Sequence, residues 1–190
     1  MNKNKIVFTF ATAEVNFIGQ IFIKITELLT GKLKLKKLYD EYLSENRPPE
    51  LFWDDAVDKL NLTLITNFKD GSYIPKKGKL IVIANHAFGV ADGVSICSAI
   101  SKVRQDYKMV THKVLRQAEA VKDKILPIDF NENREALLTN INTRKEAEKV
   151  LHNEGVLVLF PSGTIATKQN LKKNTKADDG EWKQWVSKLV

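Results

Sequence analysis

The segment LIVIANHAFGVADG occupies residues 80–93 and joins a purely apolar run to a polar loop that contains glycine. A second run of this kind, VLVLF at residues 156–160, leads into the loop PSGT at residues 161–164. Uninterrupted apolar runs of this length, rich in Val, Ile and Leu, are typical of strands that are buried on both faces of a parallel sheet. The sequence therefore predicts two central strands, each followed at its carboxyl end by a polar loop.

The rest of the chain alternates between helix and strand patterns around these two runs. Helices are expected at residues 52–60, from Asp92 to Val103 and from Arg134 to His152, where Gly155 ends the last one. Further strands are expected at residues 62–65, 107–112 and 125–130. On the long helix, the side chains expected to face the core are those of Leu137, Leu138, Ile141 and Leu151. This alternation predicts an α/β fold with a largely parallel sheet flanked by helices, preceded by N-terminal amphipathic helices.

Composition narrows the class of protein. The 190 residues are 43% hydrophobic, which suits one globular core, and the net charge of +7 suits a polyanionic partner such as nucleic acid or an anionic membrane. No basic strand carries interleaved aromatic residues and no helix-turn-helix stands out, so we expect no nucleic-acid partner. The single cysteine, Cys97, excludes an internal disulfide, and neither CxxC nor HExxH occurs. We therefore expect an intracellular protein that holds no metal.

The N-terminal region allows two interpretations. The apolar stretch at residues 6–23 is interrupted by Glu14, Asn16 and Gln20, which makes it too polar for a transmembrane helix. Beyond it, one helical stripe is formed by Ile18, Ile21, Phe22, Ile25, Leu28 and Leu29, and a basic cluster follows with Lys32, Lys34, Lys36 and Lys37. This order is typical of an interfacial membrane anchor. The alternative is a helix that covers the core while the lysines are simply solvated.

The loop after the first buried strand could hold a catalytic pair. His86 leaves the strand, and Asp92 follows six residues later at the expected start of a helix. In such a pair the carboxylate accepts a hydrogen bond from one ring nitrogen and leaves the other nitrogen free to take a proton. Gly89 and Gly93 would permit the tight loop that brings the two together. In the alternative interpretation, Asp92 only caps the helix and His86 fills space.

The loop after the second buried strand has the composition of an anion-binding turn. A Pro-x-Gly turn at residues 161–163 can expose backbone N–H groups to an oxyanion or phosphate, and Thr164 adds a hydroxyl. Three lysines follow within reach of such an anion: Lys168, Lys172 and Lys173. The turn is not a P-loop, because GxxxxGK[ST] is absent.

Taken together, the two loops resemble the motifs of the lysophospholipid acyltransferase superfamily, which includes glycerol-phosphate acyltransferases. Asn85-His86 with Asp92 resembles the first motif, usually NHxxxxD, and FPSGT at residues 160–164 resembles the third motif, usually FPEGT. Residues 125–130 stand where the second motif is expected. The resemblance covers roughly residues 28–190.

The chain departs from the usual motifs at three places. Five residues rather than four separate His86 from Asp92, an HX5D spacing similar to that of the hemolysin-like branch, which acylates ornithine-type or glycine-type lipids. Ser162 replaces the glutamate of the third motif, which leaves the carboxylate that binds the acceptor unassigned. The arginine of the second motif is replaced by Phe130 or Asn131, with Arg134 as the nearest substitute.

The resemblance implies an O-acyltransferase of phospholipid or aminolipid biosynthesis. It would move a fatty acyl group from a thioester, acyl-CoA or acyl carrier protein, to the hydroxyl of a lyso-lipid, with no further cofactor. His86 would be the general base and Asp92 its orienting partner. Substrate binding is then expected at Asn85, Gly89, Gly93, Phe160, Pro161, Ser162, Gly163, Thr164 and Arg134.

The resemblance also sets expectations for domains and location. Residues 1–60 would be a helical region that associates with the membrane, and residues 61–190 an acyltransferase domain incomplete at its C-terminal end. The protein would act as a peripheral protein on the cytoplasmic face of a membrane. Two alternatives stay open: a thioesterase that uses Cys97 as nucleophile, and an inactive or truncated homologue that only binds lipid.

Overall fold

The structure is a computed structural model that describes residues 32–65, 67, 73–167 and 176–189. The apolar stripe predicted at residues 18–29 and the lysines at positions 168, 172 and 173 lie outside these residues. The chain divides into two compact units, Met1–Leu51 and Phe52–Val190, which we describe separately. The predicted membrane role of residues 1–60 stays a prediction.

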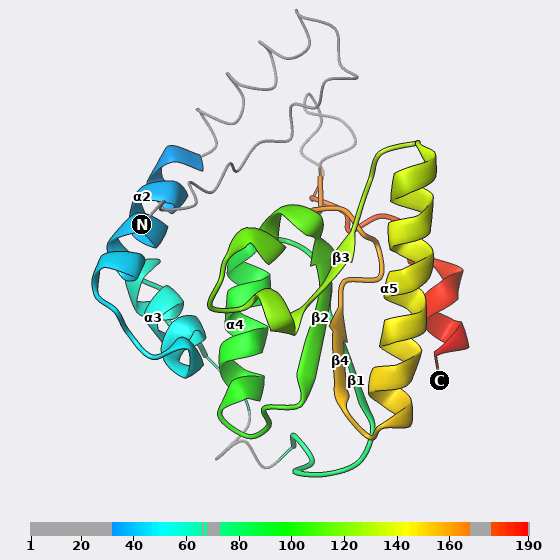
Figure 1. The fold of residues 1–190 in the computed structure, drawn as a ribbon, viewed down its shortest axis with the longest axis horizontal. Coiled ribbons are helices and arrows are strands. Elements are labelled where there is room, and N and C mark those ends of the chain that lie inside the picture. The colour runs from blue at the N-terminus through cyan, green and yellow to red at the C-terminus, as the bar shows by residue number, and fades with distance from the viewer. Residues whose placement is uncertain (1–31, 66, 68–72, 168–175, 190) are drawn as a thin grey trace, which may run out of the picture. The chain divides into compact units, whose positions relative to one another are not determined.

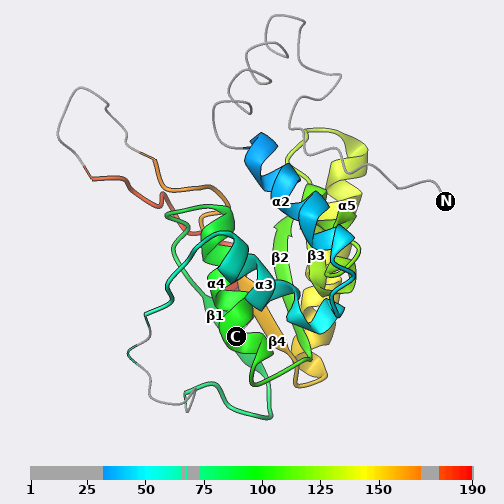
Figure 2. The same ribbon diagram turned by 90° about the vertical axis from the view of Figure 1, so that its left-hand side faces the viewer.

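The unit that begins at Phe52 is built on a four-stranded parallel sheet, which confirms the predicted α/β class. Its strands are β1 (Leu80–Ile83), β2 (Tyr107–His112), β3 (Ile125–Ile128) and β4 (Val156–Leu159), in the order β1-β4-β2-β3. Figure 2 looks onto one face of this sheet and shows the strands side by side.

The two apolar runs of the sequence pair directly with each other. They form β1 and β4, with Leu80 opposite Val156 and Ile83 opposite Leu159. Every residue of β4 is buried, whereas Ile83 in the edge strand β1 is 45% exposed. An apolar run predicted both strands, but only β4 is covered on both faces.

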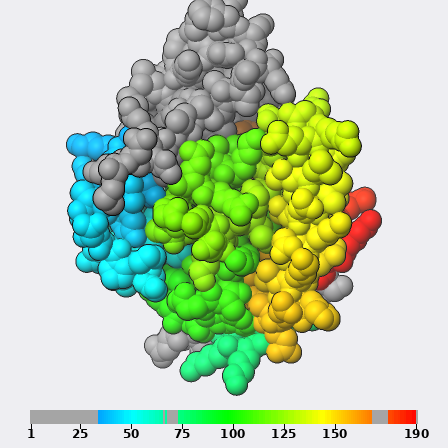
Figure 3. Space-filling model, viewed as in Figure 1, coloured from blue at the N-terminus to red at the C-terminus, as the bar shows by residue number. Residues whose placement is uncertain are grey.

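Helices cover both faces of the sheet (Figure 1). Helices α3 (Phe52–Lys59) and α4 (Val90–Ser101) lie on one face, and α5 (Arg134–His152) lies on the other with the 3₁₀ helix η4 (Gln184–Lys188). Two more 3₁₀ helices, η2 (Lys113–Gln117) and η3 (Lys122–Lys124), join β2 to β3. In the space-filling view, the yellow surface of α5 lies beside the green surface of the part of the chain that runs from α4 to β3 (Figure 3).

Helix α3 is held on α4 and on the sheet by polar contacts between buried or half-buried groups. Ser98 Oγ on α4 donates to Asp54 Oδ1 at 2.6 Å, and Trp53 Nε1 donates to the hydroxyl of Tyr107 on β2. Trp53 and Tyr107 are 5% and 2% exposed, so this bond pairs two polar groups that water does not reach. Burial raises the pKa of Tyr107 to about 12, and its hydroxyl therefore stays protonated.

The face that α5 turns to the sheet differs from the predicted one. Its buried residues are Ala136, Thr143, Ala147 and Leu151, whereas Leu137, Leu138 and Ile141 are 60%, 52% and 38% exposed. Thr143 Oγ1 donates to the carbonyl of Pro127 on β3 at 2.6 Å. Leu151 faces the core as predicted, but the rest of the packed face is made of small side chains, which let the helix backbone approach the sheet closely.

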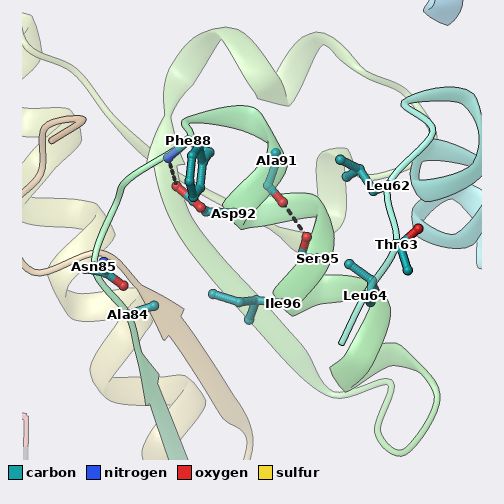
Figure 4. Close-up of a pocket in the computed structure, with 10 residues that line it drawn as sticks. All are labelled: Leu62, Thr63, Leu64, Ala84, Asn85, Phe88, Ala91, Asp92, Ser95 and Ile96. Atoms are coloured by element: carbon teal, nitrogen blue, oxygen red, sulfur yellow. Dashed lines mark hydrogen bonds between the residues drawn. The ribbon is translucent and has the colours of Figure 1, made fainter. Parts of the chain in front are cut away.

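The strand predicted at residues 62–65 is not formed. The N–H of Leu62 closes the end of α3 on the carbonyl of Val57 at 3.0 Å, and Ile65 is 88% exposed. The segment is not part of the four-stranded sheet. It instead runs along α4, where it lines a cleft described below (Figure 4).

Arg104 ties together the chain segments that enter three strands. Its side chain, 3% exposed, donates to both carboxylate oxygens of Asp106 at 2.9 and 2.6 Å. It also donates to the carbonyls of Gly78, Pro75 and Glu154 at 2.6, 3.2 and 2.6 Å. These segments lead into β1, β2 and β4, so one guanidinium satisfies carbonyls from residues far apart in the sequence.

The first unit contains the helix α2 (Lys32–Ser44) and the 3₁₀ helix η1 (Pro49–Leu51). Within α2, Lys36 pairs with Asp40, and Lys37 Nζ lies 3.8 Å from Glu41 Oε1. In the part of the chain that the structure describes, no helix has the length and apolar character that crossing a membrane requires.

Candidate active site

Both predicted loops lie at the carboxyl edge of the sheet. His86 follows β1 and Phe160 follows β4, and these strands are hydrogen-bonded neighbours. The two rings stack with centroids 4.2 Å apart and an interplanar angle of 22°. The edge where parallel strands end is where open α/β sheets bind their ligands.

The pair predicted from spacing is formed. His86 Nδ1 lies 3.0 Å from Asp92 Oδ2, and the two side chains are 20% and 14% exposed. The same Asp92 oxygen accepts the N–H of Phe88 at 2.8 Å. Because a carboxylate only accepts hydrogen bonds, the shared hydrogen lies on Nδ1, and the lone pair of the imidazole lies on Nε2. His86 is therefore in contact with the carboxylate rather than only filling space, and the catalytic role of the pair stays a prediction.

Two glycines of the first loop have different surroundings. Gly89 precedes α4 with φ +63°, and a Cβ there would come within 3.1 Å of Ile165 Cδ1. Gly93 is buried in α4, where a Cβ would meet Met109 Sδ on β2 at 3.4 Å. Gly89 shapes the loop, whereas Gly93 faces the core of the domain and not the site.

An apolar cleft of about 440 Å³ runs beside the pair. Figure 4 shows α4 between two walls, one made by residues 62–64 and the other by the end of β1. The lining residues are Leu62, Thr63, Leu64, Ala84, Asn85, Phe88, Ala91, Asp92, Ser95 and Ile96. Asp92 belongs both to the pair and to this lining, so the cleft and the pair share one residue. The cleft is absent from the sequence argument, because residues 62–64 were expected in a strand.

The PSGT loop forms a tight turn whose serine faces inward. Gly163 has φ +71°, and its N–H donates to the carbonyl of Phe160 at 3.0 Å. Pro161 is fully buried, and Ser162, 3% exposed, donates from Oγ to the carbonyl of Thr164 at 2.9 Å. Of the residues in this turn, Gly163 and Thr164 are exposed. Ser162 therefore supports the turn, and its hydroxyl does not take the place of a surface carboxylate.

Arg134 is the exposed first residue of α5, which follows β3, and β3 and β1 are the two outer strands of the sheet. Three strand spacings, about 14 Å, separate these two strands. The part of Arg134 in substrate binding stays a prediction.

A charged cluster near the end of β3 escaped sequence reasoning. Asp129, with its side chain 4% exposed, accepts from Lys113 Nζ at 2.6 Å and from the N–H of Asn131 at 3.2 Å. Burial opposes ionisation of Asp129, but these donors outweigh it and hold the pKa of the carboxyl below its usual range. Burial also lowers the pKa of the neighbouring His112, against the attraction of Asp129. Lys113 carries no motif signal, because the contact arises only when β2 and β3 pair.

Asp179 is a second residue that sequence reasoning missed. Its Oδ1 accepts the backbone N–H of His86 at 2.6 Å, across 93 positions of sequence. The acidic turn that contains it carries no spacing signal toward the first loop. Only the return of the chain to the sheet edge brings it there.

Cys97 is unsuited to nucleophilic chemistry. It is fully buried on α4, and its Sγ lies 3.6 Å from Met109 Sδ. Burial raises the pKa of the thiol to about 12, which disfavours the reactive thiolate. Among the described residues, no three His, Cys, Asp or Glu side chains are grouped as metal ligands would be.

The fold and the site together define a class of protein. A parallel α/β sheet presents a histidine–carboxylate pair at its carboxyl edge, beside an apolar cleft. The model of the Acyltransferase family matches residues 66–180, which include both loops. The chain belongs to this family and is an acyl-transferring enzyme with an acyl donor and an acceptor substrate. No curated protein and no solved structure matches it.

Proposed function

We propose that the protein transfers a fatty acyl group from a thioester to the hydroxyl of a lyso-lipid. The observation that carries this proposal is the His86–Asp92 contact of 3.0 Å beside an apolar cleft of about 440 Å³. Such a transfer requires, among other groups, a base that can take a proton from a hydroxyl and a groove for an alkyl chain. The donor would be acyl-CoA or acyl carrier protein, and no other cofactor enters the reaction.

The proposed mechanism is direct attack without an acyl-enzyme. Nε2 of His86 takes the proton of the acceptor hydroxyl while its oxygen attacks the thioester carbonyl and forms a tetrahedral intermediate. Asp92 holds the Nδ1–H tautomer and stabilises the imidazolium that forms. The intermediate collapses, the C–S bond breaks, and the imidazolium returns its proton to the departing thiolate. Cys97 has no role in this sequence.

A panel of substrates tests the function. Purified protein would be incubated with labelled acyl-CoA or acyl carrier protein and with lysophosphatidic acid, lyso-ornithine lipid and lyso-glycine lipid. Because Ser162 is buried in place of a surface glutamate, we expect aminolipid acceptors to compete with lysophosphatidic acid. Exclusive use of lysophosphatidic acid would contradict the proposed hemolysin-like preference. Release of free fatty acid without an ester product would indicate a thioesterase, and no turnover at all an inactive homologue.

The cleft should set the preferred acyl chain. Ser95 lines it, and its Oγ donates only within α4, to the carbonyl of Ala91 at 2.7 Å. Ser95→Leu should therefore fill the cleft without stranding a partner. The leucine side chain would exclude a few methylene groups of the acyl chain from the cleft. We therefore expect the KM for long-chain thioesters to rise about tenfold and the KM for short-chain thioesters to change little.

A matched substitution controls for a general effect on α4. Ser101 lies at the other end of the same helix, and its Oγ also donates to a helix carbonyl, that of Ser98. Ser101→Leu should leave the ratio of long-chain to short-chain KM unchanged. An equal change of this ratio in both variants would show that the cleft does not hold the acyl chain.

We also propose that the enzyme works as a peripheral protein at the cytoplasmic face of a membrane. Exposed apolar side chains beside the pair support this: Phe88 is 80%, Val90 43% and Ile165 50% exposed. In the first unit, α2 carries Lys34 and Lys37 as exposed cations. Exposed apolar side chains can enter the acyl region of an anionic bilayer, and lysines can contact its headgroups.

Binding to liposomes checks the electrostatic part. Binding should rise with the anionic lipid content and weaken at high salt, because surface charges are screened. Lys34→Gln with Lys37→Gln should reduce binding about ten- to thirtyfold, since each lysine near such a surface contributes about 1 kcal/mol. Lys145→Gln with Lys149→Gln, on α5, removes the same charge and should change binding less. Equal binding to neutral and anionic liposomes would reject this part of the proposal.

A further inference from the structure

The segment that follows the third motif returns to both motif loops. Asp178 and Thr167 pair through their backbones, with both N–H to carbonyl distances at 3.0 Å. The N–H of Lys183 donates to the carbonyl of Pro161 at 2.9 Å. Beyond it, Trp185 packs on the core face that α5 covers. Residues 176–189 are thus held by Thr167, by the PSGT loop and by the core. The turn between Asp178 and Lys183 lies against the first loop.

Asp179 is the side chain by which this segment reaches the first loop. Both of its carboxylate oxygens accept a hydrogen bond: Oδ1 from the backbone N–H of His86 at 2.6 Å, and Oδ2 from Trp182 Nε1 at 3.0 Å. A hydrogen bond to an ionised acceptor is shorter and stronger than one between neutral groups. The indole therefore orients the carboxylate, and the carboxylate holds the histidine backbone.

The contact completes a set that holds His86 from four directions. Its carbonyl accepts the N–H of Ala166 at 2.7 Å, its ring stacks on Phe160, and its Nδ1 contacts Asp92. With N–H and carbonyl both engaged, the peptide planes on either side of the Cα have little freedom to turn. The place of Nε2 relative to a bound acceptor follows from that backbone, and a displacement of about 1 Å can cost about 100-fold in rate.

We propose that Asp179 is a positioning residue of the His86–Asp92 pair, which acts through the backbone N–H of His86 and makes no contact with substrate. The proposal rests on the proposed role of His86 as general base. Asp179 lies outside both motif loops, so the C-terminal segment also contributes a residue to the reaction. The effect expected is on the rate of the chemical step and not on substrate binding.

Four variants separate positioning from general stability. Asp179→Ala should lower kcat about 10- to 100-fold per folded molecule and leave the KM for the thioester within about twofold. Asp179→Asn should recover part of the loss, because its amide oxygen can still accept the His86 N–H. Asp178→Ala removes the neighbouring carboxylate, and the backbone pairing of that residue remains. Trp182→Phe replaces the indole by a smaller ring that cannot donate to Asp179, so it should lower kcat by less than Asp179→Ala does. Asp178→Ala is the control and should stay within about threefold of the original kcat.

A second measurement reads the contact without any turnover. In protein labelled with ¹⁵N-histidine, the His86 amide should exchange with solvent at least tenfold faster in Asp179→Ala than in the original protein or in Asp178→Ala. Equal exchange rates, or an Asp179→Ala enzyme with full kcat per folded molecule, would overturn the proposal. Failure of the original protein to acylate any acceptor of the panel would instead overturn the proposed function. The amide exchange would then still decide whether Asp179 holds His86.

Discussion

Replacement of His86 by alanine should lower the rate of acyl transfer on the order of 10²- to 10⁴-fold, the usual loss when a general base is removed. The imidazole contacts Asp92 through Nδ1, and its second nitrogen, Nε2, is the atom that would take the acceptor proton. The ring is 20% exposed and stacks on one neighbour, Phe160, so its loss should leave the fold intact. Initial rates with a labelled thioester, together with circular dichroism and the melting temperature, measure both effects.

Asp92→Asn is the companion variant. An amide in place of the carboxylate can donate to Nδ1 and so favours the tautomer with the hydrogen on Nε2, where the base must be free. We expect kcat to fall strongly with a small change in the KM for the thioester. The same Asp92 oxygen accepts the N–H of Phe88, so an amide nitrogen in its place gives up that bond, and circular dichroism should check that the fold is kept. Transfer at the original rate in either variant would end the proposed mechanism.

Replacement of Arg104 by alanine should destabilise the domain by about 3–5 kcal/mol, a large part of the 5–15 kcal/mol that a typical domain has in total. The variant leaves three carbonyls, those of Pro75, Gly78 and Glu154, without the guanidinium that now donates to them. Hydrogen bonds to a charged group contribute about 1.5–3 kcal/mol each, and the loss of those made by this buried guanidinium, offset in part by water at the exposed Pro75 and Glu154, gives the expected total. The melting temperature should fall by about 10 °C or more.

Two further substitutions make this result specific. Arg104→Lys keeps the charge but not the planar guanidinium that reaches Asp106 and the carbonyls together. Its melting temperature should therefore lie between that of the original protein and that of Arg104→Ala. Lys102→Met removes a nearby surface cation, which pairs with Asp54 at 3.3 Å with 59% of its side chain exposed. An exposed pair is worth about 0–1 kcal/mol, so this control should melt within a few degrees of the original. A melting temperature unchanged in Arg104→Ala would contradict the proposed role of the network.

Local pattern was sufficient where one segment carries all the information. The two apolar runs became the strands β1 and β4, of which only β4 is buried throughout, and the helix from Arg134 to His152 has the predicted bounds. His86 and Asp92 were paired from spacing, because a six-residue loop at a strand end has few ways to place both side chains. The match of the Acyltransferase model to residues 66–180 supports the resemblance first drawn from these same loops.

Prediction failed where the answer depends on a partner element. The sequence favoured Leu137, Leu138 and Ile141 as the inward face of α5, yet the sheet accepts Ala147 at full burial instead. Size and hydrophobicity along a helix do not say how close the opposing surface will come. For the same reason residues 62–65 were expected to pair as a strand, whereas they form one wall of the cleft beside α4.

By itself the sequence determined the α/β class, the two apolar strands β1 and β4 and the loops that carry His86, Asp92 and the PSGT turn. Each of these is a property of neighbouring residues, which act on one another through backbone propensity and burial. Only the tertiary structure decided the strand order β1-β4-β2-β3, the edge position of β1 and the inward turn of Ser162. It alone brought Asp179 to His86, since no local pattern encodes a hydrogen bond that spans 93 positions and forms when the chain returns to the sheet edge.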